Sequence, residues 1–277
     1  MMTRGPARGW PAIQRGDDPP FNAGCRMPIE VESCVASHVG DRPEQQDRVG
    51  LFVHPRYPDV VLAVLADGMG GLSGGAMAAE QVLLRARQNL ESYAPRHETP
   101  ESLLRSVLSE AHTGIRLTRF TSELEPHSTA VALVLQPQGV WWAHCGDSRA
   151  YHFRGGALMS RTRDHSIVGE LQHSGVLDEA GARNHPRRSV LLSCLGDQRE
   201  PRIDIAWTRP LLAGDRFLLC SDGLWAYFSD SELALALHEH APRTAAEHLL
   251  ALARERASGA GDNISLAIIK LAGRSTR

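Results

Sequence analysis

The order of apolar patterns along this chain constrains its fold more than any other feature of the sequence. Two pairs of helix-like segments are separated by a block of strand-like segments, and further strand-like segments stand at both ends. Strands and helices alternate in a parallel βαβ sheet, so this order argues against that architecture. Consecutive strands joined by short turns form antiparallel sheets instead. We therefore predict an α+β fold, a four-layer α-β-β-α sandwich of two antiparallel sheets flanked by helix pairs.

The predicted strands are recognised by apolar alternation or by short continuous apolar runs. They span 29–35, 48–54, 60–66, 129–136, 140–145, 149–154, 202–208, 215–220 and 264–270. Every residue of 60–66 is apolar, which is typical of a strand covered on both faces. The predicted helices carry apolar stripes at 79–90, 104–115 and 246–253. Between the last two stripes, a further helix begins at the capping box formed by Ser229 and Glu232.

Composition and charge exclude several classes of protein. The 277 residues include 30 Lys and Arg against 32 Asp and Glu, a formal net charge of -2, which argues against a nucleic-acid-binding surface as the main function. No apolar run approaches the ~20 residues of a membrane span. The five cysteines are scattered and form no Cys-x-x-Cys pair, so we expect a reduced, cytoplasmic protein without a zinc knuckle or disulfide framework.

The N-terminal segment, residues 1–28, differs from the rest of the chain. It is rich in arginine and proline and lacks the apolar stretch of a secretory signal. We predict a disordered extension, or an upstream start codon before Met27. A single domain then follows over residues 29–272 and includes a polar excursion at about 160–188.

Four aspartates stand at the ends of predicted strands. Each of them directly adjoins a glycine or an asparagine; they are Asp67, Asp147, Asp222 and Asp262. A single Asp-Gly pair is common in turns, and each aspartate alone could close a hairpin. A cluster of buried carboxylates, by contrast, needs cations or must protonate, and Mg²⁺ and Mn²⁺ prefer such oxygen ligands. Their shared placement favours a divalent-cation site over four unrelated turns.

Six short segments extend this pattern. In chain order they are GDRPEQQD (40–47), DGMGG (67–71), GDSR (146–149), DHS (164–166), SDGL (221–224) and GDNIS (261–265). Their order and spacing resemble the motif series of type 2C (PPM) metal-dependent Ser/Thr protein phosphatases of bacterial type, over residues 29–271. The resemblance implies a β-sandwich flanked by helices, with a two-metal site at one end.

The resemblance also implies a metal-ligand set. Asp67 would bridge both metals, and the Gly68 carbonyl would bind one of them. Asp222 and Asp262 would complete the protein ligands of the other metal. Asp147, together with Asp222, resembles the site of a third metal in bacterial members. The expected cofactor is therefore Mn²⁺ or Mg²⁺, as two ions or three.

Two further residues match catalytic positions of the family. Arg42 corresponds to the arginine that holds the substrate phosphate, and its planar, permanently charged fork suits that role. Asp47 corresponds to the acidic residue near the bridging solvent. Two departures concern the same region: Gln46 stands where the family commonly has a glutamate that supports the second metal through water. Met69 stands where many eukaryotic members have a histidine, and methionine is frequent there in bacterial members.

The polar excursion at 160–188 resembles the segment that the family calls the flap, beside the catalytic cleft. It contains three histidines and five arginines: His165, His173, His185, Arg161, Arg163, Arg183, Arg187 and Arg188. A basic lip that attracts phosphorylated loops and a solvated, partly helical excursion are both consistent with this composition. The histidines lack a metal-ligand spacing, so we assign them no ligand role.

The resemblance implies a protein-serine/threonine phosphatase, that is, a phosphoric monoester hydrolase. It would hydrolyse phosphoserine and phosphothreonine in proteins through a water activated by two metals. Its expected partners are phosphorylated proteins, the substrates of a bacterial Ser/Thr kinase that it opposes. The sequence of 164–196 resembles phosphatases that accompany type VI secretion systems. The alternative is a catalytically weak or silent phosphoprotein-binding relative, in which Gln46 has disabled the second metal site.

Overall fold

The computed structural model describes residues 29–70, 74–118 and 125–273, so the prediction for residues 1–28 lies outside the described part. The strands are β1 (Ile29–His38), β2 (Asp47–Val53), β3 (Val61–Met69), β4 (His127–Ser128), β5 (Ala130–Gln136), β6 (Gly139–Cys145), β7 (Arg149–Arg154), β8 (Ala157–Arg161), β9 (Asp204–Thr208), β10 (Arg216–Cys220) and β11 (Ile264–Gly273). The helices are α1 (Gly74–Ser92), α2 (Pro100–Thr118), α3 (Ile167–His173), α4 (Glu179–Arg183), α5 (Asp222–Trp225), α6 (Asp230–Glu239) and α7 (Pro242–Ala257). In this described part, no helix has the length and apolarity needed to cross a membrane.

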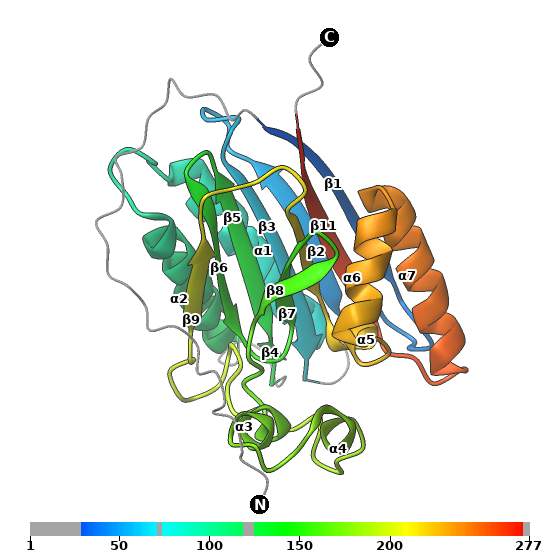
Figure 1. Ribbon diagram of the computed structural model, residues 1–277. Coiled ribbons are helices and arrows are strands. Elements are labelled where there is room, and N and C mark those ends of the chain that lie inside the picture. Colours follow the sequence, from blue (N-terminus) through cyan, green and yellow to red (C-terminus); the bar gives the residue numbers. More distant parts are fainter. Residues whose placement is uncertain (1–28, 71–73, 119–124, 274–277) are drawn as a thin grey trace, which may run out of the picture.

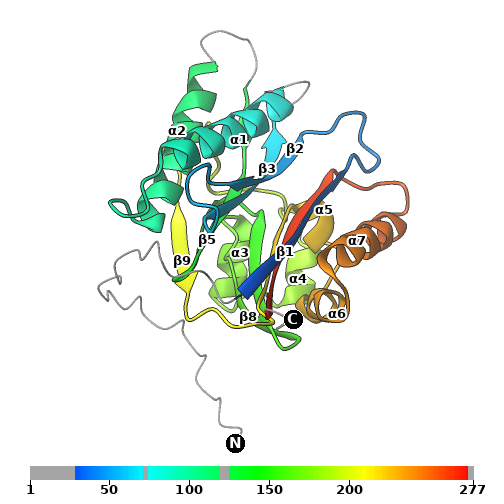
Figure 2. The ribbon, with the colours of Figure 1, turned by 90° about the horizontal axis from the view of Figure 1, so that it is seen from above.

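Two antiparallel sheets stack face to face (Figure 1). The first has the strand order β1-β11-β10-β7-β8, and the second has the order β2-β3-β5-β6-β9, with β4 paired to β3. Figure 2 shows α1 and α2 outside the second sheet and α6 and α7 outside the first. The predicted four-layer α-β-β-α sandwich is confirmed.

The run of apolar residues in β3 is explained by the two layers that this strand contacts. Leu62, Val64 and Ala66 belong to an apolar cluster with α1 and α2. Ala63 and Leu65 face the opposite way and pack in the layer between the sheets. All five side chains have no exposed surface, which is the burial expected of a strand covered on both faces.

Glycines let the backbone approach closely where two aspartates end their strands. A Cβ at Gly68 would lie 2.0 Å from the Gly75 carbonyl oxygen, and a Cβ at Gly223 would lie 2.0 Å from the Asn263 carbonyl oxygen. Any larger residue would therefore push these segments apart. The two Asp-Gly pairs thus bring β3 onto α1, and α5 onto the loop that leads into β11.

Three elements were not predicted from the sequence: β4, which has only two residues, β8 and α5. β8 is a largely exposed edge strand, so it lacks the apolar alternation that identifies a half-buried strand. α5 has four residues and is too short to show a helical stripe. Asp222 is therefore the first residue of a helix, and Ser221 precedes it in an extended conformation.

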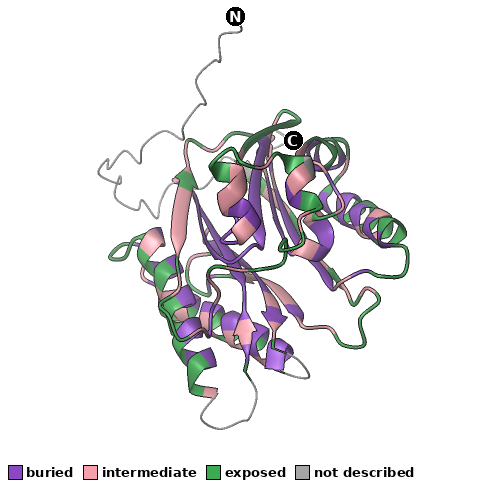
Figure 3. Cartoon of the chain, turned by 90° about the horizontal axis from the view of Figure 1, so that it is seen from below, coloured by how far each residue is buried: buried purple, intermediate pink, exposed green. Residues whose placement is uncertain are grey.

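The flap, residues 160–188, carries α3 and α4 at one end of the sandwich (Figure 1). Figure 3 views the molecule from this end. The strands in the middle consist mostly of buried residues, and many residues of the surrounding loops are exposed. The ends of several buried strands thus meet at the end of the sandwich that carries the flap.

Candidate active site

The four strand-end aspartates line one cleft of about 590 Å³. Asp67 comes from the end of β3, Asp147 from the turn between β6 and β7, and Asp222 from the start of α5. Asp262 comes from the loop before β11, and Arg42 comes from the loop before β2. The structure therefore brings together residues that are up to 220 positions apart in the chain.

Gly68 lines the same cleft, beside Asp67. Gln46 and Met69 also line it, so both departures from the family pattern lie at the site itself. The donors that these segments offer are carboxylate and carbonyl oxygens, which are the ligands that Mg²⁺ and Mn²⁺ prefer. The donor set fits the predicted cations, while the individual ligand roles remain predictions.

The electrostatics of the cleft agree with a site for cations. Burial, together with repulsion from Asp47, Asp222 and Asp147, raises the pKa of Asp67 well above its usual value. Burial and the neighbouring Asp262 raise the pKa of Asp222 to about 6. The pKa of Asp147 is likewise raised by burial and by Asp222. Without a cation the site favours partial protonation, and a divalent ion would relieve the same repulsion.

Asp47 lies behind this cleft and is 2% exposed. It stands directly opposite Asp67 in the β2–β3 register. Its Oδ2 accepts a hydrogen bond of 2.8 Å from the Ser221 hydroxyl. Burial raises the pKa of Asp47 to about 7, with Asp222 and Asp262 adding to the effect and the Ser221 hydrogen bond opposing it.

Arg42 stands at the edge of the cleft. Its Nη2 donates to Asp262 Oδ2 at 2.7 Å, and 58% of the Arg42 side chain is exposed. The guanidinium is therefore next to a candidate metal ligand and accessible to an incoming phosphate. The prediction that Arg42 holds the phosphate is compatible with this position.

The turn that carries Asp147 is held by three other segments. Gly146 exchanges hydrogen bonds with His165 at the base of the flap. The Asp147 carbonyl accepts a 2.9 Å hydrogen bond from Trp225 Nε1, and Thr129 Oγ1 lies 2.6 Å from Ser148 Oγ. Each residue of this turn is thus fixed by a different element.

A buried ion pair connects the flap to the same region. Arg149 donates to both carboxylate oxygens of Asp164, at 2.8 and 2.7 Å, and its guanidinium lies 3.6 Å above the centre of the Trp225 ring. Arg149 and Asp164 stand within two of the six motifs without an expected role, and Trp225 stands in none of them. The residue types of Arg149 and Asp164 were the only sign in the sequence that the two could pair, because the pairing itself depends on the fold.

One group of possible ligands lies outside the cleft, formed by His144, His165 and Asp204, whose donor atoms lie within 4.8 Å of one another. His165 Nε2 is 3.2 Å from Asp204 Oδ2, and His144 Nε2 is 2.8 Å from the Arg163 carbonyl oxygen. Asp204 also accepts a 2.8 Å hydrogen bond from Arg202. These contacts connect the base of the flap to β6 and β9.

Comparisons with known proteins match these features. A family model described as Protein phosphatase 2C matches residues 35–256. The serine/threonine phosphatase stp of Listeria monocytogenes is 31% identical over 235 residues, which are 83% of this chain and 91% of the relative. The catalytic domain of the serine/threonine protein phosphatase PstP, solved in complex with two manganese ions, has a TM-score of 0.73 and 26% identity, covering 88% of this chain and 99% of that one.

A third match is PppA of Pseudomonas aeruginosa, which is described as a key regulatory component of the type VI secretion system. It has a TM-score of 0.71 and 30% identity, over 87% of this chain and 97% of that one. The resemblance drawn from the six motifs is confirmed. The chain belongs to the protein phosphatase 2C family of bacterial serine/threonine phosphatases.

Proposed function

We propose that this protein hydrolyses phosphoserine and phosphothreonine in other proteins, in a reaction that depends on Mn²⁺ or Mg²⁺. The observation that carries the proposal is the convergence of four carboxylates with one arginine in a single cleft. The two manganese ions bound by a structural relative of the same fold support the choice of cation.

Asp67, the Gly68 carbonyl, Asp222 and Asp262 would hold two ions, and Asp147 would share a third with Asp222. Bound ions lower the pKa of a shared water and offset the charge of the phosphoryl group. The remaining work falls to the side chains around them.

Arg42 orients the substrate. Its exposed guanidinium can give two N–H groups to the phosphate oxygens, which fixes the phosphorus for in-line attack. Asp47 would lie near the bridging solvent, behind the cleft. The Ser221 hydroxyl fixes the orientation of its carboxylate. Met69 lines the cleft but has no proton to donate, so the leaving serine or threonine oxygen takes its proton from water or from another acid.

The experiment is a turnover assay with p-nitrophenyl phosphate and with a phosphothreonine peptide. Both should be hydrolysed with Mn²⁺, and EDTA should abolish the activity. Turnover that persists in EDTA, or no turnover with any divalent cation, would refute the proposal.

We also propose that the phosphatase opposes a Ser/Thr kinase of its own cell, in the context of type VI secretion. The likeness to PppA supports this context. Phosphoproteomics of a deletion strain should show phosphorylation rising at the sites of one kinase. The silent, phosphoprotein-binding alternative is not favoured, because all the predicted carboxylates border the cleft or, for Asp47, lie directly behind it.

A further inference from the structure

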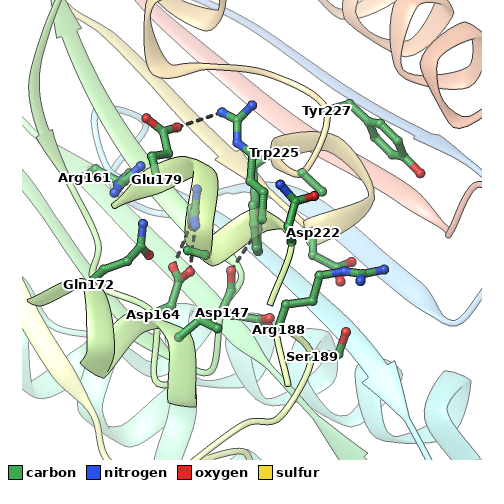
Figure 4. Close-up of a pocket in the computed structure, with 16 residues that line it drawn as sticks. Asp147, Arg161, Asp164, Gln172, Glu179, Arg188, Ser189, Asp222, Trp225 and Tyr227 are labelled. Atoms are coloured by element: carbon green, nitrogen blue, oxygen red, sulfur yellow. Dashed lines mark hydrogen bonds and ion pairs between the residues drawn. The ribbon is translucent and has the colours of Figure 1, made fainter. Parts of the chain in front are cut away.

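A second cavity, of about 400 Å³, lies beside the catalytic cleft (Figure 4). The flap forms one of its walls, and α5 with the residues after it forms the other. Asp147, Asp222 and Ser189 line both this cavity and the cleft. A peptide whose phosphate occupies the cleft can therefore place a neighbouring side chain in the cavity.

Most of the charges in the cavity wall are already neutralised inside the protein. Three arginines have carboxylate partners; the pairs are Arg149–Asp164 at 2.7 Å, Arg161–Asp230 at 3.0 Å and Arg183–Glu179 at 2.7 Å. Asp147 and Asp222 are the candidate ligands of the third cation, whose charge would offset theirs. These groups give the cavity little preference for an anion or a cation.

Arg188 differs from the other arginines of the wall. Its side chain is exposed and forms no ion pair or hydrogen bond with any residue in the described part of the chain. It lies near Tyr227, whose phenol pKa is raised by burial and by Asp222, Asp262 and Asp41, an effect that Arg188 partly offsets. Figure 4 shows the Arg188 side chain at the same side of the cavity as Asp222 and Ser189.

The opposite part of the wall offers an amide and apolar surface. Gln172, from α3, has no side-chain hydrogen bond to the described residues. Val168 and Ala182 contribute buried apolar surface from α3 and α4. The cavity thus combines a short apolar contact surface with one unpaired cation and one free amide.

We propose that this cavity is a specificity subsite for an anionic side chain close to the phosphorylated residue of the substrate; the proposal rests on the proposed function. Arg188 pairs with the anion on the side of the cavity nearest the cleft. The anion is either the carboxylate of Asp or Glu or the phosphate of a second phosphorylated residue. Both present oxygens that an arginine binds in the same way.

The test uses phosphothreonine peptides that are identical except at one neighbouring position. That position carries Ala, Lys, Asp or a second phosphothreonine, and it is moved through the three residues on either side. At one of these positions we expect the wild-type protein to favour the anionic peptides in kcat/KM by about fivefold over Ala, the upper range for an exposed ion pair. Comparing Asp with the second phosphothreonine distinguishes the two sources of the anion.

Arg188→Glu should remove or reverse this preference. Arg187→Glu is the matched control, because it makes the same charge change at the adjacent exposed residue, which does not line the cavity. Gln172→Ala, which changes the opposite part of the wall, should leave this preference unchanged. Equal effects of Arg188→Glu and Arg187→Glu, or equal kcat/KM for all wild-type peptides, would overturn the subsite.

The wild-type assay with p-nitrophenyl phosphate distinguishes a failure of the subsite from a failure of the proposed function, because this substrate has no neighbouring residue. If it is hydrolysed while all peptides react alike, the subsite is wrong and the proposed function stands. If neither kind of substrate is hydrolysed, the proposed function is wrong and the subsite is wrong with it.

Discussion

The sandwich and the flap are held together by different interactions. In the sandwich, strands such as β3 and β5 are buried on both faces, and each aspartate of the cleft lies within two residues of a strand end. In the flap, only some residues are buried, such as Asp164, Val168 and Ala182, and the outer part has exposed ion pairs such as Arg183–Glu179. The candidate catalytic residues are therefore positioned by the ends of buried strands, whereas the proposed subsite is lined largely by a polar segment at the surface.

The largest expected effect tests the rigid region. Asp67→Asn removes the carboxylate proposed to bridge two ions, and should lower Mn²⁺-dependent kcat by roughly three orders of magnitude, because metal-assisted charge stabilisation contributes several kcal/mol. The fold should survive, since the change also removes repulsion among the buried carboxylates. Steady-state kinetics and thermal unfolding measure the two effects.

Asp59→Asn is the control for this change. Asp59 lies in the loop between β2 and β3, next to the end of β3 that is opposite to Asp67. It does not line the cleft. Its substitution should leave kcat unchanged. Wild-type turnover in Asp67→Asn would contradict the proposed bridging role.

The next effect tests how the flap is joined to the sandwich. Asp164→Ala leaves the buried Arg149 guanidinium without its carboxylate, and breaking a buried pair in this way costs roughly 3–5 kcal/mol of unfolding free energy. Glu91→Ala breaks the exposed pair Arg87–Glu91 and should cost about 0–1 kcal/mol. Urea denaturation measures both. Similar losses for the two variants would show that the flap is not anchored by the buried pair.

A third prediction concerns pH and the metal-free protein. The pKa of Asp47 is about 7 in the folded state against an ordinary 3.8, so between these pH values the folded state holds a proton that the unfolded state has released. The free energy of unfolding should therefore fall as pH rises from about 4 to 7. Urea denaturation in EDTA at several pH values measures this slope.

Asp47→Asn should make that slope less steep, because the amide does not titrate whereas Asp67, Asp147 and Asp222 still do. Asp59→Asn again serves as the control and should keep it. An unchanged slope in Asp47→Asn would mean that Asp47 titrates normally in the folded protein. Such a result would mean that only the other carboxylates of the cleft have raised pKa values.

The sequence alone predicted the sandwich and the convergence of the carboxylates, for a physical reason. Burial on both faces requires an uninterrupted apolar run, so 60–66 was recognisable as a central strand that delivers Asp67 to its end. The contacts of Trp225 with Asp147 and of Ser221 with Asp47 could not be predicted, because they join residues 78 and 174 positions apart. The cavity under the flap was hidden for the same reason, since it forms between segments without an apolar pattern.

The smallest expected effect asks whether α5 helps to position Asp147. Trp225→Phe keeps an aromatic ring beside Arg149 but removes the N–H that donates to the Asp147 carbonyl. A net hydrogen bond contributes about 0.5–1.5 kcal/mol, so the weakest Mn²⁺ site should lose about two- to tenfold in affinity. Calorimetric titration with Mn²⁺ measures this directly, and high Mn²⁺ should restore kcat.

Tyr227→Phe is the matched control, because it removes a polar group from an aromatic residue two positions later that makes no hydrogen bond to Asp147 in the described structure. It should leave every Mn²⁺ affinity unchanged. A Trp225→Phe protein that is less stable but binds Mn²⁺ as the wild type does would show that Trp225 only packs the sandwich. Weaker Mn²⁺ binding with unchanged stability would instead show that the hydrogen bond sets Asp147 against Asp222, the first residue of the same helix.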